Sequence, residues 1–490
     1  MSGDASEGAL LLHRVRDLVA RQRVTCAVAT AVSDVARRMT DERVGSVVVL
    51  DADGTPTGIV TDRDLRRKVV AAGRDPRTTP ASAIMSTPLV TTPPTALALD
   101  ALLQMTRHEI HHLVVVDGGR LLGVVSSHDL FGLQAEDPVV IGRGIGSAAS
   151  VGALAALADR TTRLVRRLVE AGAAALDVAQ LVAELNDRVI AKVLDLIGQA
   201  LRDAGGGVPP VPYCWLLFGS EARREQTLRT DQDNGLVYAD PPDALRAAVE
   251  SYYARFTTEA IRALVDVGFP RCPGDVMASN PRWCQPLSAW ADQFRRWIDH
   301  PSPQEVLEAS IFFDLRPVTG AAGLAEALRD VVRREAPKSR VFLGLLAHDV
   351  VSRRVPLTIF GNIATLGSGA HRGRVDVKGA GCLQLVGAAR VGALELGLAE
   401  TNTVDRIRAA TAHGVYTPEE ATEIGDAYQH LLRLRLVHQL SRLADGAEPD
   451  NYVDPARLSH ADALLFRDAL KTVGRVQAGL RARFSTDRLG

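Results

Sequence analysis

The stretch FGSEARREQTLRTDQDNG, residues 218–235, decides the fold class expected for this chain. It continues the apolar run YCWLLF (213–218) through a Gly-Ser turn, and ten residues later two aspartates stand one residue apart. A second apolar run, DNGLVYAD (233–240), begins there. The pattern predicts two strands of an α/β domain, with Asp231 and Asp233 on one face near the start of the second strand, since strand side chains alternate.

The spacing of these acids and the turn predicts a metal–triphosphate site. Two close carboxylates repel, so one would tend to take up a proton unless a cation lies between them. Mg²⁺ (or Mn²⁺) is commonly held by one or two carboxylates plus substrate phosphates. Gly219 lets the backbone approach a triphosphate, and Ser220 offers a hydroxyl and N–H groups to its oxygens. We therefore expect Asp231, Asp233, Gly219 and Ser220 to bind a metal and an NTP.

A third acid follows in EASIFFDLRPV (308–318), where Asp314 lies in an apolar run with β character. An unpaired buried charge is costly, and a shared metal would explain it. Arg223 is a candidate triphosphate ligand because guanidinium groups bind phosphate in a bidentate manner. The alternative for Arg223 is a surface helix paired with Glu225. Arg316 is expected to share a strand face with Asp314 and neutralise charge there.

This layout resembles the nucleotidyltransferase superfamily: a Gly-Ser, about ten residues, Asp-x-Asp and a later carboxylate. The wider wording, GSEARREQTLRTDQDNG with FFDLRPV, is similar to the DUF294 family of nucleotidyltransferase-like proteins, relatives of the enzymes that uridylylate PII signalling proteins. The resemblance implies that Asp231 and Asp233 bind metal and that Asp314 ligates a metal and activates the acceptor. The reaction implied is transfer of an NMP from an NTP to an acceptor, such as a signalling protein.

An internal repeat occupies the front of the chain. ARRMTDERVGSVVVLDADGTPTGIVTDRDL (36–65) and LLQMTRHEIHHLVVVDGGRLLGVVSSHDL (102–130) each read as helix, strand, turn, strand and helix start. The two copies are expected to pack together. Their endings resemble paired CBS domains, which implies a cleft for an adenine nucleotide and a homodimer formed through this pair. The residues expected to face that ligand are Thr61, Asp64, Ser126 and Asp129. The alternative is that these residues only cap helices.

The expected fold is α/β and α multidomain. It comprises an N-terminal helix (1–21), a tandem CBS module (22–75 and 80–135), a helical linker (136–204), a nucleotidyltransferase α/β domain (205–340) and a C-terminal helical bundle (341–490). The last resembles the substrate-binding domain of the DUF294 family. Lys378 and Arg390 are its candidate contacts to base, phosphate or acceptor, the alternative being ordinary surface cations.

Two other features were interpreted as structural. Trp283, Trp290 and Trp297 stand seven residues apart, which on a helix makes one stripe and indicates a core more strongly than a base-stacking surface. His348 and Asp349 lack the further spaced ligands of a metal-dependent phosphohydrolase. We therefore expect no such activity and a structural role for this pair.

Composition restricts the partners. The formal net charge of −1 gives no general attraction for nucleic acid or anionic membrane, so neither is an expected partner. The five cysteines follow no metal-binding or disulfide spacing, and no long apolar run or leader is evident, so a cytoplasmic location is expected. The alternative to an enzyme is a catalytically silent adenylate-sensing protein.

Overall fold

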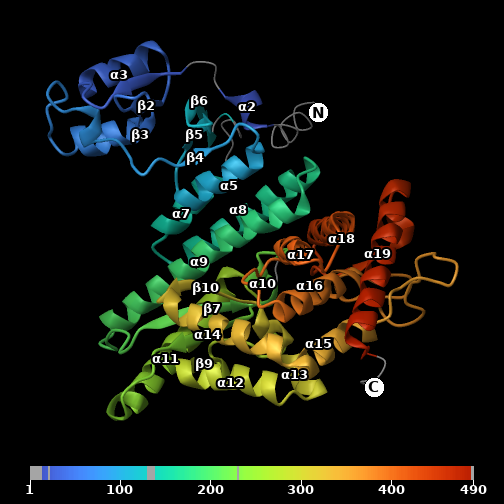
Figure 1. Ribbon diagram of the computed structural model, residues 1–490. Helices are drawn as coiled ribbons and strands as arrows, with labels where there is room; N and C mark the ends of the chain where they lie inside the picture. Colours follow the sequence, from blue (N-terminus) through green and yellow to red (C-terminus); the bar gives the residue numbers. More distant parts are fainter. Residues whose placement is uncertain (1–13, 20–22, 128, 130–137, 229–230, 487–490) are drawn as a thin grey trace. The chain divides into compact units, whose positions relative to one another are not determined.

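The computed structural model describes residues 14–19, 23–127, 129, 138–228 and 231–486 (Figure 1). The chain forms two compact units, each described by itself below. Unit 1 holds residues 1–144 and 170–173, and unit 2 holds residues 145–169 and 174–490. Of the predicted N-terminal helix, residues 1–13 and 20–21 lie outside the described residues. No helix in the described ranges has the length and apolar character needed to cross a membrane.

Unit 1 contains the repeat as two three-stranded sheets with the same topology. In each, the first two strands pair in parallel and the last two pair antiparallel. The strands are β1 (Thr25–Ala27), β2 (Ser46–Leu50), β3 (Pro56–Thr61), β4 (Thr91–Thr92), β5 (His112–Asp117) and β6 (Arg120–Ser126). The helices are α2 (Val15–Leu18), α3 (Val32–Asp41), α4 (Asp62–Asp64), η1 (Leu65–Val70), η2 (Ala81–Ala83), α5 (Ala98–His108) and α7 (Pro138–Ser147), the last of which ends in unit 2.

The local sequence explains this shared topology. The β-branched runs SVVVL and HLVVVD form central strands whose valines are buried, except for the partly exposed Val116. Helix α3 buries Val32, Val35 and Met39, which recur at helical spacing, against the first sheet. The predicted repeat of helix, strand, turn and strand is confirmed.

Unit 2 contains a four-stranded sheet that carries the candidate site. Its strand order is β10-β7-β8-β9. β7 (Tyr213–Phe218) pairs antiparallel with both β10 (Leu315–Gly320) and β8 (Asn234–Tyr238), and β9 (Cys284–Pro286) pairs parallel with β8. Figure 1 shows α14 (Ala322–Glu335) and α9 (Ala175–Asp203) on either side of this sheet, where they contact β7 and β10 respectively.

The remaining elements of unit 2 are mostly helical. They are α8 (Val151–Glu170), α10 (Gly219–Arg223), η3 (Asp243–Leu245), α11 (Arg246–Val267), η4 (Pro281–Trp283), α12 (Leu287–Asp299), α13 (Pro303–Ala309), η5 (Ser310–Phe313), η6 (Ala336–Lys338), α15 (Arg340–Ser352), β11 (Val375–Asp376), η7 (Lys378–Cys382), α16 (Leu383–Glu395), α17 (Thr403–Ala412), α18 (Pro418–Ala444), β12 (Tyr452–Val453), η8 (Pro455–Arg457) and α19 (His460–Phe484). The mixed α/β and helical fold class is confirmed.

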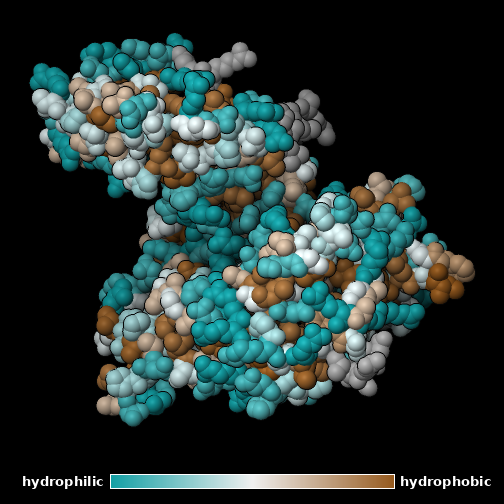
Figure 2. Space-filling view, viewed as in Figure 1, coloured by the Kyte–Doolittle hydropathy of each residue, from teal (hydrophilic) through white to brown (hydrophobic). Residues whose placement is uncertain are grey.

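One hydrophobic core joins the sheet to the helices around it. Cys214, Leu216 and Phe218, alternate residues of β7, pack with residues of α12, α14, α15 and α16. The three tryptophans belong to this core and are at most 7% exposed, so their interpretation as core is confirmed. The surface seen in Figure 2 has hydrophilic and hydrophobic residues interspersed.

Three local predictions were wrong. Asp231 and Asp233 precede β8 instead of lying in it, and Asp314 follows the short helix η5, one residue before β10. Trp283 lies in η4, while Trp290 and Trp297 lie in α12, so no single helix carries all three. The apolar runs locate the elements, but proline and polar residues at their ends set the boundaries.

Candidate functional site in unit 2

The Gly-Ser turn connects β7 to the short helix α10. Gly219 has φ +56°, a left-handed conformation that side chains other than glycine rarely adopt. A Cβ at this position would lie 3.4 Å from Oδ2 of Asp233, so glycine also leaves room for that carboxylate. The backbone N–H of Phe218 donates to the carbonyl of Asp233 over 2.9 Å. The turn and the second aspartate are thus held together.

Asp231 and Asp233 meet a third residue that the sequence analysis did not name. Ligand atoms of Asp231, Asp233 and Cys272 all lie within 4.8 Å of one another. Burial, and next the charge of Asp231, raise the pKa of Asp233 to about 6. Burial thus opposes a negative charge on Asp233, and the neighbouring carboxylate adds to that cost.

The three side chains can bind a divalent cation, and their ligand atoms decide which kind of cation each of them suits. The two carboxylates suit Mg²⁺ or Mn²⁺, which prefer oxygen ligands. The Cys272 thiol suits softer ions such as Zn²⁺. The donor set therefore supports the two aspartates as ligands of a hard cation and makes Cys272 a ligand only for a softer one.

Asp314 lies in a different environment from the one predicted. It is 0% exposed, and its two oxygens accept hydrogen bonds from three arginines. Arg223 Nη1 and Arg390 Nη2 each donate to Oδ2 over 2.6 Å, and Arg406 Nη1 donates to Oδ1 over 2.5 Å. Burial opposes ionisation, but the three guanidinium groups hold the pKa of Asp314 well below its usual range. In the structure Asp314 thus pairs with arginines and does not belong to the group formed by Asp231, Asp233 and Cys272.

A second acid, Glu225, completes this buried ion cluster. Its carboxylate accepts from Arg223 Nε over 2.6 Å, from the Thr403 backbone N–H over 2.6 Å and from the Tyr428 hydroxyl over 2.7 Å. Arg223 is 5% exposed, so the alternative of a surface helix paired with Glu225 is wrong, although the pairing itself exists. The cluster fixes Arg223 between two acids while leaving it at the edge of a pocket.

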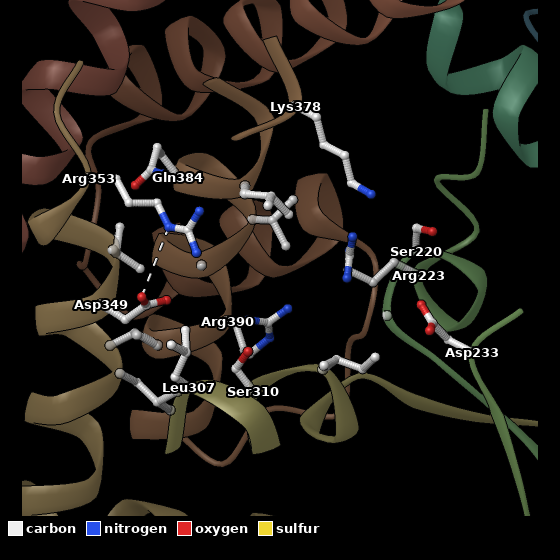
Figure 3. Close-up of a pocket in the computed structure, with 18 residues that line it drawn as sticks. Ser220, Arg223, Asp233, Leu307, Ser310, Asp349, Arg353, Lys378, Gln384 and Arg390 are labelled. Carbon is white, nitrogen blue, oxygen red and sulfur yellow. Dashed lines mark ion pairs between the residues drawn. The ribbon is translucent and has the colours of Figure 1, made fainter. Parts of the chain in front are cut away.

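That pocket has a volume of about 270 Å³ and gathers most of the predicted residues (Figure 3). Its lining includes the predicted Gly219, Ser220, Arg223, Asp233, Lys378 and Arg390. Lys378 comes from η7 and Arg390 from α16, over 140 residues after the Gly-Ser turn. Asp231 and Asp314 are not among the lining residues.

The pocket also includes residues that the sequence analysis missed or dismissed. Asp349 and Arg353 of the α15 region line it together with Leu307 and Ser310. Asp349, which the sequence analysis interpreted as structural, thus lies at a pocket wall. The available sequence signal was the spacing of Asp349 and Arg353, which stand four residues apart among apolar residues in LLAHDVVSRR (345–354). This spacing places both side chains on one face of a helix.

Glu221 and Arg316 secure the turn from behind. Glu221 is 2% exposed, and burial together with Asp233 and Asp187 raises its pKa well above the usual value. Arg316 donates to both oxygens of Asp187 on α9, over 2.7 and 2.8 Å, and to the carbonyl of Glu221 over 3.1 Å. Arg316 thus bonds to Asp187 and α10, and it does not pair with Asp314 as expected.

The predicted CBS ligand residues form two similar helix caps in unit 1. Oδ2 of Asp64 accepts from the Thr61 hydroxyl over 2.7 Å, and Oδ2 of Asp129 accepts from the Ser126 hydroxyl over 2.6 Å. Asp64 is 7% exposed and also pairs with Lys68 over 2.8 Å. Burial raises the pKa of Asp64, but the hydrogen bonds from Lys68 and Thr61 outweigh burial and lower it.

The second of these caps opens onto a pocket. Ser126 and Asp129 line a pocket of about 360 Å³ within unit 1. Arg23, Arg43 and His112 also line it, which supplies cationic and hydrogen-bonding groups. Thr61 and Asp64 are not among its lining residues.

Family models match three parts of the chain. A CBS domain model matches residues 15–71 and 81–136. The model described as "Putative nucleotidyltransferase DUF294" matches residues 159–304, and that of the "Putative nucleotidyltransferase substrate binding domain" matches residues 340–484. This chain is a CBS-domain member of the DUF294 family.

The DUF294 protein also resembles smaller CBS proteins. It is 35% identical over 119 residues to "CBS domain-containing protein YhcV" of Bacillus subtilis, covering 24% of this chain and 84% of that one. It is 33% identical over 127 residues to "Uncharacterized protein MK0525" of Methanopyrus kandleri, covering 26% and 64%. The solved structure "CBS domain protein PAE2072 from Pyrobaculum aerophilum complexed with AMP" shares 33% identity, with 24% and 90% coverage and a TM-score of 0.23. Each similarity extends over about a quarter of the DUF294 protein.

Proposed function

We propose that the DUF294 protein transfers a nucleoside monophosphate from an NTP to an acceptor, such as a signalling protein, and that an adenine nucleotide bound to the CBS pair regulates the transfer. The observation that supports this most is the pocket in unit 2. There Gly219, Ser220 and Asp233 of the sheet region face Lys378 and Arg390 of the helical region. One pocket thus offers a carboxylate for a metal and cations for phosphate.

The charge balance around the pocket favours an anion. Arg223, Arg390 and Arg406 surround Asp314, and Glu225 adds a second negative charge. The pocket lining itself holds four cations, Arg223, Arg353, Lys378 and Arg390, against two acids, Asp233 and Asp349. Preorganised cations of this kind stabilise phosphoryl groups and cost no rearrangement when ligand binds.

The proposed roles follow from position. Asp231 and Asp233 would hold Mg²⁺ or Mn²⁺, which would neutralise phosphate charge. Ser220, Lys378, Arg223 and Arg390 orient the triphosphate. An acceptor oxygen then forms a bond to the α-phosphorus while the bond from that phosphorus to the β-phosphate oxygen breaks, so pyrophosphate leaves and the proton of the acceptor passes to water. Asp314 acts by positioning Arg223 and Arg390, because arginines occupy its oxygens.

Regulation is proposed to act through the unit 1 pocket. Ser126 and Asp129 would meet the ribose of an adenine nucleotide, while Arg23 and Arg43 offer positive charge to its phosphates. A second copy of the chain, paired through its CBS domains, is the proposed assembly.

One observation favours a second function, a silent nucleotide sensor. The third carboxylate expected to activate the acceptor is fully paired with arginines. A chain of this kind would bind NTP and metal without transferring a nucleotide.

Both functions are tested in one experiment. The full chain is incubated with Mg²⁺, cell extract and each NTP labelled at the α-phosphate, and labelled products and pyrophosphate are measured. We expect transfer that Asp231→Asn and Asp233→Asn reduce at least 100-fold. The matched control is Asp299→Asn, an exposed acid on α12. NTP binding without pyrophosphate or labelled product would support the sensor and reject the transferase.

A further inference from the structure

The unit 2 pocket has two ends of different chemistry. At one end lie Gly219, Ser220 and Asp233, and Figure 3 shows Asp349 and Arg353 at the opposite end. The proposed triphosphate ligands Lys378, Arg223 and Arg390 lie between them or beside Ser220. Asp233 lies in a group that could hold a cation, whereas Asp349 is not part of such a group among the described residues and repels phosphate, so its end is suited to a different part of the ligand.

Asp349 and Arg353 form a long ion pair with each other, drawn as a dashed line in Figure 3. They are one helical turn apart, and Nε of Arg353 lies 4.0 Å from Oδ1 of Asp349. This distance is too long for a hydrogen bond. Their side chains are 31% and 45% exposed, so both keep polar atoms turned to solvent or ligand.

The walls beside this pair are apolar. Leu346 and Val350 lie on the same face of α15, and Leu307 of α13 lines the same end while remaining 45% exposed. The amide of Gln384 is already used, since it donates to the Gly379 carbonyl over 2.8 Å and accepts from Gln477 over 3.2 Å. A flat ring could therefore pack between aliphatic side chains, with Asp349 and Arg353 at its edge.

The order of donors and acceptors indicates which ring fits best. A carboxylate offers two acceptors, and a guanidinium offers only donors. Guanine presents the complement on one edge: the O6 acceptor next to the N1–H and N2–H donors. Uracil presents an acceptor, a donor and another acceptor, so one carbonyl would face the carboxylate. Arginine is also a preferred partner of the guanine O6 atom.

We propose that Asp349 and Arg353 form the base subsite of this pocket and select guanine, so that the donor nucleotide is GTP. This inference rests on the proposed function, because it takes the opposite end of the pocket as the triphosphate site. It names the donor, whereas kinship with uridylylating enzymes would favour UTP.

The test measures binding to the full chain, so it does not depend on an acceptor. The α,β-methylene analogues of GTP, ATP, CTP and UTP are titrated with Mg²⁺ by calorimetry. An Asp129→Ala substitution in every protein weakens the separate unit 1 site. We expect the GTP analogue to bind about tenfold tighter than the UTP analogue.

A gain-of-function variant makes the test specific. Asp349→Asn replaces one acceptor by a donor, which suits xanthine, where a carbonyl stands in place of the guanine 2-amino group. We expect this variant to lose about tenfold in affinity for the guanine analogue and to gain for the xanthine analogue, while Asp299→Asn changes neither. Binding of all four nucleotides within about threefold of one another, or an unchanged preference in Asp349→Asn, would overturn the base assignment alone. Absence of binding by every analogue would overturn the triphosphate site as well.

Discussion

Arg390 of α16 donates two hydrogen bonds to Asp314, from Nε to Oδ1 over 3.1 Å and from Nη2 to Oδ2 over 2.6 Å. This pairing joins the start of β10 to the helical region, and Arg223 and Arg406 share the same carboxylate. An acid that would serve as a metal ligand in a simple reading of the sequence is here the centre of a buried ion cluster. The consequences can be measured.

Asp314→Asn should destabilise the protein strongly at pH 7. Removing one partner of a buried ion pair typically costs about 3–5 kcal/mol, because the remaining charges stay buried without compensation. Because the folded-state pKa of Asp314 is depressed, its contribution is present above the ordinary carboxyl pKa and is lost as the pH falls below about 4. Urea unfolding at pH 7 and pH 3 measures both effects.

The control for this variant is Asp405→Asn, which removes an exposed pair with Arg408. Its effect should be about 1 kcal/mol or less. If Asp314→Asn were as mild as this control but abolished Mg²⁺ binding, Asp314 would be a metal ligand after all.

Glu221→Gln should stabilise the protein at neutral pH. The folded-state pKa of Glu221 is raised by burial, so ionisation at pH 7 is unfavourable in the folded state. The contribution of Glu221 to the free energy of unfolding is therefore greatest below the pKa that it has in the unfolded state. This contribution is lost as the pH rises through the pKa that it has in the folded state. Glutamine removes this loss, so the Tm difference should be positive at pH 8 and near zero at pH 4. A gain of 1 kcal/mol corresponds to about 2–4 °C.

Glu250→Gln, on the exposed side of α11, is the comparison, and its effect should stay small at both pH values. A Tm of Glu221→Gln that is equal to or below that of the parent protein at pH 8 would mean that ionised Glu221 has a partner in solution.

Cys272 should make the aspartate pair bind soft metals more tightly than Mg²⁺. Its Sγ lies within 4.8 Å of the carboxylate oxygens, and a thiolate adds affinity for Zn²⁺ and Co²⁺. The pKa of Cys272 is raised to about 11, mainly by burial, so metal must displace a proton and affinity should increase with pH. Co²⁺ binding should give a sulfur-to-metal charge-transfer band.

Cys272→Ser should abolish that band and lower Zn²⁺ affinity by about 10–100-fold. Loss of a hydrogen-bond partner of a metal ligand typically has an effect of this size. Mg²⁺ affinity should stay within about twofold of the parent value. A charge-transfer band that persists in Cys272→Ser would place the metal elsewhere.

The two CBS caps should respond differently to substitution. Asp129 lines the unit 1 pocket, so Asp129→Ala should weaken AMP binding by about tenfold or more with little change in Tm. Asp64 is buried and paired with Lys68, so Asp64→Ala should instead lower the Tm. Calorimetry should give one AMP per chain. Equal weakening by both variants, with two nucleotides bound, would contradict this difference.

The sequence predicted which residues belong to the site better than it predicted which of their charges pair. Gly219, Ser220, Asp233, Lys378 and Arg390 were named from motif and charge, and the structure brings them to one pocket. Their elements have clear periodicity, so the fold class followed from local patterns.

What the sequence could not indicate was which charges neutralise one another. Asp314 and Arg406 lie 92 residues apart, and nothing in the local pattern of either distinguishes a buried partner from a solvated one. Asp349 was dismissed for a related reason: a single acid on an apolar helix becomes interpretable only when the opposite wall of its pocket is known.

The ion pairs of Asp314 with Arg390 and Arg406, and the hydrogen bond from the Thr403 backbone N–H to Glu225, cross the boundary that family models draw near residue 340. Dividing the gene at this boundary would leave unpaired charged side chains on both fragments. Neither fragment should therefore fold when it is expressed alone. A chimaera that takes its C-terminal segment from a distant relative should fold only when that segment keeps the arginines that pair with the buried acids. The two segments should therefore be inherited together.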